Sequence, residues 1–119
     1  MTDTDNLAQH IIEGMQERKG HDITVVDMSR LEHANTSTFI ICTGNSSMQV
    51  DAIADSVREY VQEHSGTKPY NYDGYANSEW IVIDYGTIFA HIFLPDVRER
   101  YNLEQLWNDA SIKRIADIY

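Results

Sequence analysis

The residue types that could carry catalysis or hold a metal ion in this 119-residue chain are five histidines, one cysteine and nineteen carboxylates. Their spacing argues against both roles. Cys42 lies inside the apolar run 39–43, where a thiol is usually inert packing rather than a nucleophile. The histidines form no i,i+4 pair and no Cys/His cluster of the kind that binds zinc; they are His10, His21, His33, His64 and His91. We therefore expect no catalytic residue, no metal and no cofactor.

A turn of sequence Gly44-Asn45-Ser46-Ser47 stands between a predicted strand and a predicted helix, where it could place a phosphate at a helix N-terminus. It lacks the lysine of a P-loop and the three glycines of a dinucleotide site. It is similar to the Gly-Ser turn of nucleotidyltransferases, but those enzymes need paired carboxylates to hold two magnesium ions. Asp84 stands alone at a predicted hairpin tip. A magnesium-dependent nucleotidyltransferase-like enzyme using Ser46 and Asp84 stays an alternative hypothesis.

Asp84 and His91 belong to the segment 79–95, which reads as two β-rich runs around the turn 84–87. Gly86, at the third position of that turn, supplies the positive φ that a tight hairpin needs. We predict a hairpin with Tyr85 and Gly86 at its tip. The residues then expected to face each other are Asp84 with Thr87, Val82 with Phe89, and Trp80 with His91.

The two faces of this predicted hairpin differ in chemistry. One is purely aliphatic and suited to burial under helices: Ile81, Ile83, Ile88, Ala90, Ile92 and Leu94. The other mixes aromatic rings with a carboxylate and an imidazole: Trp80, Val82, Asp84, Thr87, Phe89, His91 and Phe93. Aromatic anchors among polar groups are typical of interfaces. Alternatives are a second core layer beneath helices and a catalytic cleft. We predict a protein-binding surface made of Trp80, Asp84, Tyr85, Phe89, His91 and Phe93.

The elements that must position this hairpin follow from hydrophobic periodicity. Helices are predicted over 5–19 and 47–64, strands over 22–27 and 39–43, and a short edge strand over 70–72. Asn102, with Gln105 three residues later, resembles a capping box that opens a last helix with Leu103, Leu106, Trp107 and Ala110 inside; Ile112, Ile115 and Tyr119 extend it. This order predicts a single α/β domain, a mixed β-sheet with flanking helices.

Net charge sets the class of partner. The formal charge is −10, which disfavours direct binding to nucleic acid and favours a basic protein partner. On the helix 47–64 four carboxylates recur every four residues, as a solvated face or as a row that steers a basic partner: Asp51, Asp55, Glu59 and Glu63. No leader, membrane span or lipidation motif is recognised, so a cytoplasmic location is expected.

Four motifs, taken in order, resemble the ribosomal silencing factor family (RsfS, also called Iojap-like). They are Gly44-x-Ser46-x-x-Gln49-Val50-x-Ala52-Ile53-Ala54, Trp80-x-x-x-Asp84-Tyr85-Gly86, His91-Ile92-Phe93, and Tyr101-Asn102-Leu103-Glu104-x-Leu106-Trp107-x-Asp109-Ala110. The resemblance runs from about residue 7 to 110 of one domain, 1–119, and leaves 111–119 as a tail. The chain departs from the family pattern at Ser37-Thr38, at Met48 and at Thr87.

The resemblance implies a nucleotidyltransferase-like fold that has lost its catalytic carboxylates, and a protein that is not an enzyme. It implies binding to the fourteenth protein of the large ribosomal subunit, a basic protein, on the face that meets the small subunit. Joining of the subunits would be hindered and translation lowered when nutrients are scarce. A homodimer in the free state is a further hypothesis, because an unpartnered aromatic face can pair with itself. A generic acidic adaptor protein is the remaining alternative.

Overall fold

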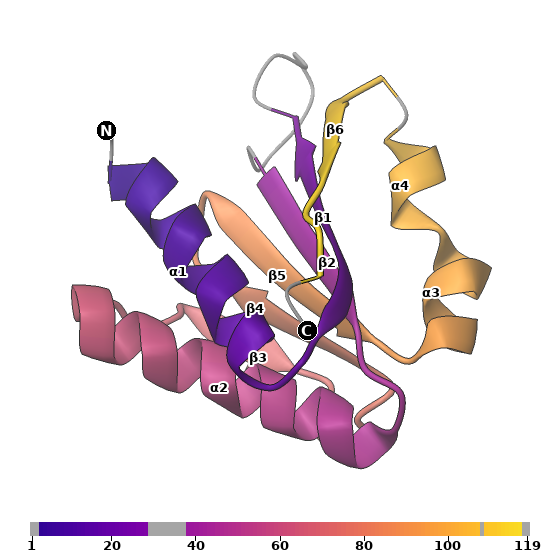
Figure 1. The fold of residues 1–119 in the computed structure, drawn as a ribbon, viewed down its shortest axis with the longest axis horizontal. Helices are drawn as coiled ribbons and strands as arrows, with labels where there is room; N and C mark the ends of the chain where they lie inside the picture. Colours follow the sequence, from indigo (N-terminus) through magenta and orange to yellow (C-terminus); the bar gives the residue numbers. More distant parts are fainter. Residues whose placement is uncertain (1–2, 29–37, 108, 118–119) are drawn as a thin grey trace.

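The computed structural model describes residues 3–28, 38–107 and 109–117 (Figure 1). Four helices and six strands lie in these ranges. In chain order they are α1 (Asp3–Glu17), β1 (His21–Asp27), β2 (Thr38–Thr43), α2 (Ser47–Ser65), β3 (Asn71–Asp73), β4 (Trp80–Asp84), β5 (Ile88–Phe93), α3 (Pro95–Tyr101), α4 (Leu103–Leu106) and β6 (Ser111–Arg114). The predicted single α/β domain with a mixed sheet is confirmed.

The six strands form one sheet in the order β3-β4-β5-β2-β1-β6. The β2–β5 pair is parallel and the other pairs are antiparallel. β2 lies in the middle of the sheet, and Ile40, Ile41 and Cys42 are fully buried, which fits the near-continuous apolar run read from the sequence.

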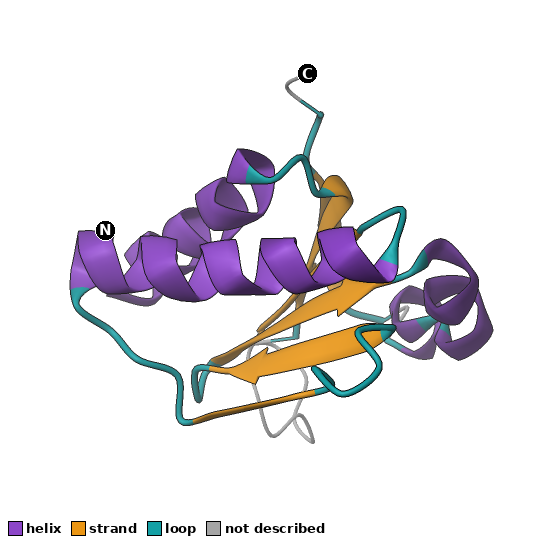
Figure 2. Cartoon of the chain, turned by 90° about the horizontal axis from the view of Figure 1, so that it is seen from below, coloured by secondary structure: helices purple, strands orange, loops and turns teal. Residues whose placement is uncertain are grey.

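The two long helices, α1 and α2, cover one face of the sheet, while α3 and α4 lie against the other (Figures 1 and 2). Side chains that alternate along each strand divide between these faces. The core under α1 and α2 takes Ile81, Ile83, Ile88, Ala90 and Ile92 from the hairpin, all fully buried. The predicted aliphatic face is therefore confirmed for these five residues, whereas Leu94, the sixth, follows β5 at the N-cap of α3 and is half-buried.

Contact between α1 and α2 is close because Gly14 has no side chain. A Cβ atom at Gly14 would lie 2.8 Å from Cα of Val57. At the same crossing the Ser56 hydroxyl donates a buried hydrogen bond of 2.7 Å to the carbonyl oxygen of Gly14. The periodicity of the sequence does not predict this contact.

α2 begins and ends with standard capping residues. The Ser46 hydroxyl accepts from the backbone N–H of Gln49 at 3.1 Å, and Gly66 takes the left-handed conformation that ends the helix. Its predicted inner stripe is fully buried: Val50, Ile53, Ala54, Val57 and Val61. α1 starts two residues earlier than predicted, and Lys19, at φ 61°, is the left-handed residue after it rather than Gly20.

The hairpin forms, but with a different register from the predicted one. The N–H of Tyr85 donates to the carbonyl of Ile88 at 2.9 Å, so Gly86 and Thr87 make the tip, with Gly86 at φ +89°. Observed cross-strand pairs are Asp84 with Phe89, Val82 with His91, and Trp80 with Phe93. The prediction was wrong by two residues because it placed the tip one residue early. A shift of two preserves the faces, so the division between aliphatic and aromatic sides survives.

The C-terminal part differs most from expectation. Asn102 caps α4 through its side chain, as predicted, but α4 ends at Leu106 and Leu106 is 68% exposed rather than inward. The segment 111–114, predicted to extend a helix, is the strand β6, paired antiparallel with β1. A strand here satisfies backbone groups on the outer edge of β1, which outweighs the weak helical pattern of Ile112 and Ile115.

Three remaining sequence-based points concern an edge strand, Ser37 and a membrane span. The predicted edge strand at 70–72 is β3, which lies one residue further along the chain at Asn71–Asp73. Ser37, one of the positions at which the chain departs from the family pattern, lies outside the described residues. Across the part of the chain that the structure describes, no helix has both the length and the apolar character needed to cross a bilayer.

Candidate protein-binding surface

The aromatic side of the sheet is partly covered. A second, smaller core joins Val26, Met28, Ile41 and Phe93 to Val97 of α3, with Leu103 and Trp107 packed against it. The alternative of a second core layer is thus correct for the part of this face beneath α3 and α4. Trp80, which packs against this second core, is half-buried, as are Asp84 and Phe89.

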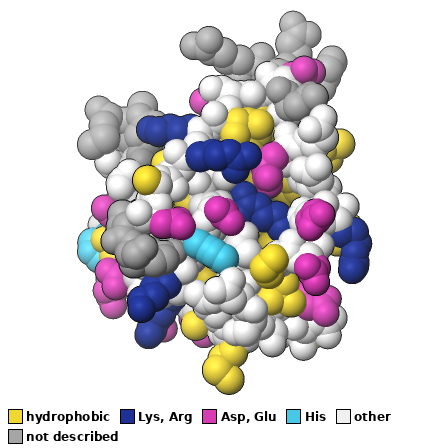
Figure 3. Space-filling model, turned by 45° about the vertical axis from the view of Figure 1, so that its right-hand side comes forward, with side chains coloured by type: hydrophobic (Ala, Val, Ile, Leu, Met, Phe, Trp, Pro, Cys, Tyr) yellow, Lys and Arg dark blue, Asp and Glu magenta, His cyan; other side chains and the backbone are white. Residues whose placement is uncertain are grey.

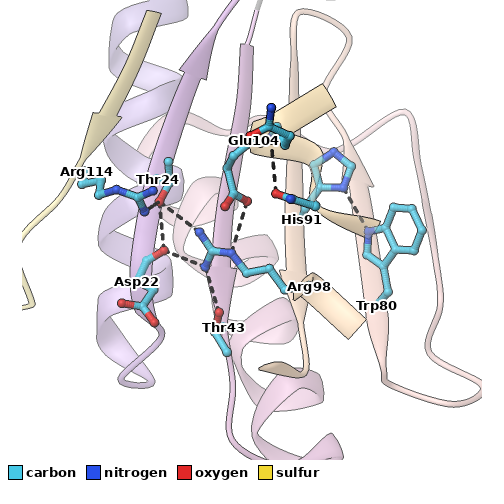
Figure 4. A network of polar contacts seen from close by, with 10 residues as sticks. Asp22, Thr24, Thr43, Trp80, His91, Arg98, Glu104 and Arg114 are labelled. Carbon is cyan, nitrogen blue, oxygen red and sulfur yellow. Dashed lines mark hydrogen bonds and ion pairs between the residues drawn. The ribbon is translucent and has the colours of Figure 1, made fainter. Parts of the chain in front are cut away.

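Two neighbouring rings and one hydrogen bond hold the Trp80 side chain in place. Its ring stacks on Phe93 at 4.9 Å between centroids, and Tyr101 at the end of α3 lies 4.7 Å away. Its indole Nε1–H donates to Nδ1 of His91 at 3.0 Å (Figure 4). Since Tyr101 is 51% exposed, Trp80 and Tyr101 together form an aromatic ridge at the rim of the covered region.

His91 lies beneath this ridge and is only 5% exposed. Its ring packs in a T-shaped arrangement with Phe39, 4.5 Å between ring centroids, and runs nearly parallel to Phe93, two residues along the strand. Burial in this aromatic setting lowers the pKa of His91 to about 3, because a charged imidazole would lose its hydration. The ring is therefore neutral at physiological pH.

Three of the six predicted binding residues are buried within the chain itself: Tyr85, His91 and Phe93. Tyr85 belongs to the core under α1 and α2, where burial raises the pKa of its hydroxyl. Tyr85 and His91 are each only 5% exposed, so their side chains offer little surface to a partner in this structure. Trp80, Asp84 and Phe89 are the predicted residues that the structure brings to the surface together.

Asp84 has a local structural task as well. Its carboxylate accepts a 2.7 Å hydrogen bond from the backbone N–H of Gly86 and so closes the hairpin tip. A carboxylate has further lone pairs after accepting one bond. Asp84 can therefore hold the turn and still accept from a basic group outside.

Arg98 of α3 makes a polar network that sequence reasoning missed (Figure 4). Its guanidinium donates to the hydroxyl of Thr43 at 2.8 Å and to that of Thr24 at 3.0 Å, and pairs with Glu104 at 3.3 Å. It also donates to the carbonyl of Asp22 at 2.8 Å. No spacing pattern could reveal these contacts, because Asp22, Thr24 and Thr43 lie 76, 74 and 55 residues away in the chain.

The bond from Arg98 to Asp22 depends on an irregularity in β1. The β1–β2 register shifts between His21 and Thr24, and Asp22 has φ 51°. Such a bulge removes a carbonyl from regular ladder pairing, and here the carbonyl of Asp22 meets Arg98. The network therefore fixes α3 and α4, and with them Tyr101, against the sheet.

The surface over α3, α4 and β6 mixes charges of both signs with apolar side chains (Figure 3). Leu106 and Ile112 are exposed there.

On α2, the four carboxylates of the predicted acidic row differ in their contacts. Asp55 accepts from the Tyr75 hydroxyl and Asp51 from that of Ser78, while Glu59 and Glu63 are exposed.

The geometry does not assemble the enzyme site considered above. Ser46 follows the end of β2 at Thr43, which pairs with Phe93, whereas Asp84 pairs with Phe89. Four residues of strand separate these positions, about 13 Å. Within the described ranges, no group of three or more His, Cys, Asp or Glu side chains is placed to hold a metal ion. Cys42 is buried, and desolvation raises its pKa to about 12, as expected of an inert thiol.

Comparisons with known proteins agree with this geometry. A sequence model described as "Ribosomal silencing factor during starvation" matches residues 1–118. The ribosomal silencing factor RsfS of Halalkalibacterium halodurans is 35% identical over 104 residues, 87% of each chain. The chloroplastic protein Iojap of Zea mays is 36% identical over 106 residues, 89% of this chain and 45% of that protein. A crystal structure of a Chromobacterium violaceum protein superposes with a TM-score of 0.84 at 30% identity, covering 98% of this chain and 97% of the other.

Proposed function

Because this chain belongs to the ribosomal silencing factor family, we propose that it represses translation by occupying a site that the small ribosomal subunit must approach. The family consists of non-enzymatic regulators that bind the large ribosomal subunit. The specific contact proposed here is with the basic fourteenth protein of that subunit. Binding would take place in the cytoplasm and lower translation when nutrients are limiting.

The half-buried residues of the hairpin support this proposal. Trp80, Phe89 and the adjacent Tyr101 provide aromatic side chains that are fixed by their neighbours. Such rigid aromatic anchors carry much of the binding free energy at interfaces. Asp84 at the hairpin tip, in a chain of net charge −10, provides the sign of charge that a basic ribosomal protein requires.

The observation that carries the proposal is Trp80, a large ring held in place at the rim of the covered core. Replacing Trp80 with Ala is expected to weaken binding to the purified fourteenth protein by more than about 2 kcal/mol, the range of interface hot spots. Isothermal titration calorimetry measures this change. Met48→Ala, at an exposed position on α2, is the matched control and should bind as the wild type does. An unchanged affinity for a folded Trp80→Ala variant would refute the assignment of this surface.

Sedimentation separates this function from a generic acidic adaptor. On a sucrose gradient with purified ribosomal subunits, the chain should travel with the large subunit, whereas an adaptor unrelated to ribosomes would stay at the top.

We also propose that the free protein forms a homodimer through the same aromatic surface. Light scattering that shows only particles of 13.7 kDa at high concentration would exclude that dimer.

A further inference from the structure

We infer that His91 is a positioning residue for the proposed ribosome-binding surface: its neutral imidazole fixes the Trp80 indole and makes no contact with the partner. This inference rests on the proposed function and assigns a division of labour within the site. Trp80 presents a ring to the partner, and His91 determines where that ring lies.

The hydrogen bond defines the state of the imidazole. The indole nitrogen of Trp80 carries a hydrogen and can only donate, so Nδ1 of His91 must accept at their 3.0 Å separation. In a neutral ring the proton then resides on Nε2. Burial of His91 disfavours the doubly protonated ring, which could not accept this bond.

The second ring nitrogen of His91, Nε2, shows that packing alone does not favour a histidine at this position. Among the described residues, Nε2 is buried and has no hydrogen-bond partner. Burying an unpaired N–H lowers stability. Phe39, Phe89 and Phe93 surround the ring, so a phenylalanine at this position would suit the neighbourhood and avoid that penalty. The one described interaction that a phenylalanine could not reproduce is the bond to Trp80.

The register of the hairpin makes this interaction possible. Trp80 lies directly opposite Phe93, and His91 lies diagonally from it, two residues along β5. A tryptophan side chain is long enough to reach a diagonal neighbour. Phe93 supports the face of the indole and Tyr101 lies beside it, while the bond to His91 fixes its rotation. Rotation is the degree of freedom that stacking alone leaves open.

The free protein provides the first test. Its two indole N–H groups, from Trp80 and Trp107, give two ¹⁵N–¹H signals, and the one missing from Trp80→Phe is assigned to Trp80. His91→Phe should shift the Trp80 signal and speed its exchange with solvent, leaving that of Trp107 nearly in place. In the wild type, ¹⁵N spectra of the imidazole should show a protonated Nε2 and an unprotonated Nδ1. A protonated Nδ1 would overturn the inference even if His91→Phe does not fold.

Binding provides the second test, as a double-mutant cycle with purified large ribosomal subunits. His91→Phe should weaken binding about tenfold when Trp80 is present, the size expected for one orienting hydrogen bond. The same change made in Trp80→Phe, which has no indole N–H, should have no effect. Ile92→Val, a neighbouring change that faces the opposite core, controls for lost stability and should leave affinity unchanged.

The possible failures can be told apart. An equal loss of affinity in both backgrounds would mean that His91 acts through its own contacts or through general packing. An unchanged affinity, with a displaced Trp80 signal, would mean that the orientation of the indole does not matter for binding. Either result overturns the inference. If the wild type does not bind large subunits, the proposed function fails and this inference falls with it, although the signals of the free protein would still report the hydrogen bond.

Discussion

The two faces of the sheet are built in opposite ways. The face under α1 and α2 is sealed by aliphatic side chains and by a close helix crossing at Gly14. The other face carries a small core and a polar network around Arg98, and leaves Trp80, Phe89 and Tyr101 partly open to solvent. The larger apolar core therefore lies on one side of the sheet, and the partly exposed aromatic side chains lie on the other.

This difference supports the proposal that the second face is the binding surface. A fully sealed second layer would offer no aromatic anchors, and a fully open one would expose a large apolar patch prone to association. The short helices α3 and α4 cover the middle of that face and stop at Tyr101 and Leu106. Polar contacts from Arg98 to the sheet hold that partial cover in place.

The largest effect is expected on the sealed face. Ile53→Ala removes a fully buried side chain of α2 and should lower the free energy of unfolding by about 4 kcal/mol, since it loses apolar burial and leaves a cavity. Urea denaturation measures the change. Binding per folded molecule should stay as in the wild type. A loss below about 1 kcal/mol would contradict the view that this face carries the stability.

A smaller loss is expected from the polar network. Arg98→Met keeps much of the side-chain volume but removes the donor to the hydroxyls of Thr43 and Thr24 and the ionic partner of Glu104. Thr24 keeps its bonds to Asp22 and Arg114. We expect a loss of about 3 kcal/mol in unfolding free energy, again by urea denaturation. Arg98→Lys should not restore it, because an ammonium cannot reproduce the planar guanidinium contacts. Full rescue by lysine would show that charge alone matters.

The pH dependence of stability should reflect the aromatic face. Because the pKa of His91 is about 3 in the folded chain and about 6.5 when unfolded, the unfolded state binds more protons between these values. Stability from this group is full above about pH 6.5 and falls as pH drops toward 3, by at most about 1.4 kcal/mol per pH unit. Chemical denaturation between about pH 7 and about pH 5 should show a steeper decline for the wild type than for His91→Phe. If the unfolding free energies of the two proteins changed equally with pH, His91 would have to be more solvated than the structure shows.

The smallest effect on stability is expected at the exposed end of α4. Leu106, 68% exposed at the end of α4, should tolerate replacement by Ala with a change within about 0.5 kcal/mol in unfolding free energy. Thermal denaturation followed by circular dichroism is sufficient to detect a larger change. A loss of about 2 kcal/mol or more, beyond the range expected for surface substitutions, would mean that Leu106 is packed in the free protein and that α4 belongs to the sealed part of the molecule.

The sequence by itself determined the α/β class, the long helix α2 with its buried stripe, and the chemical difference between the hairpin's two faces. These features follow from periodicity and capping, which are local and survive small errors of register: a shift of two residues moved every cross-strand pair of the hairpin and changed no face. The sequence also placed Trp80, Asp84 and Phe89 among the candidate binding residues; the structure leaves them half-buried, and their role stays a prediction.

Tertiary structure alone decided which aromatic side chains are covered and what holds the cover. Nothing local distinguishes the buried His91 and Phe93 from the half-buried Trp80 and Phe89, because the difference depends on where α3 and α4 end over the sheet. Arg98 meets Thr43, Thr24 and Asp22 across 55 to 76 residues of chain, and 111–114 becomes a strand because β1 offers it an edge. Such contacts form between segments that are distant in sequence, so their physical cause appears only once the chain has folded.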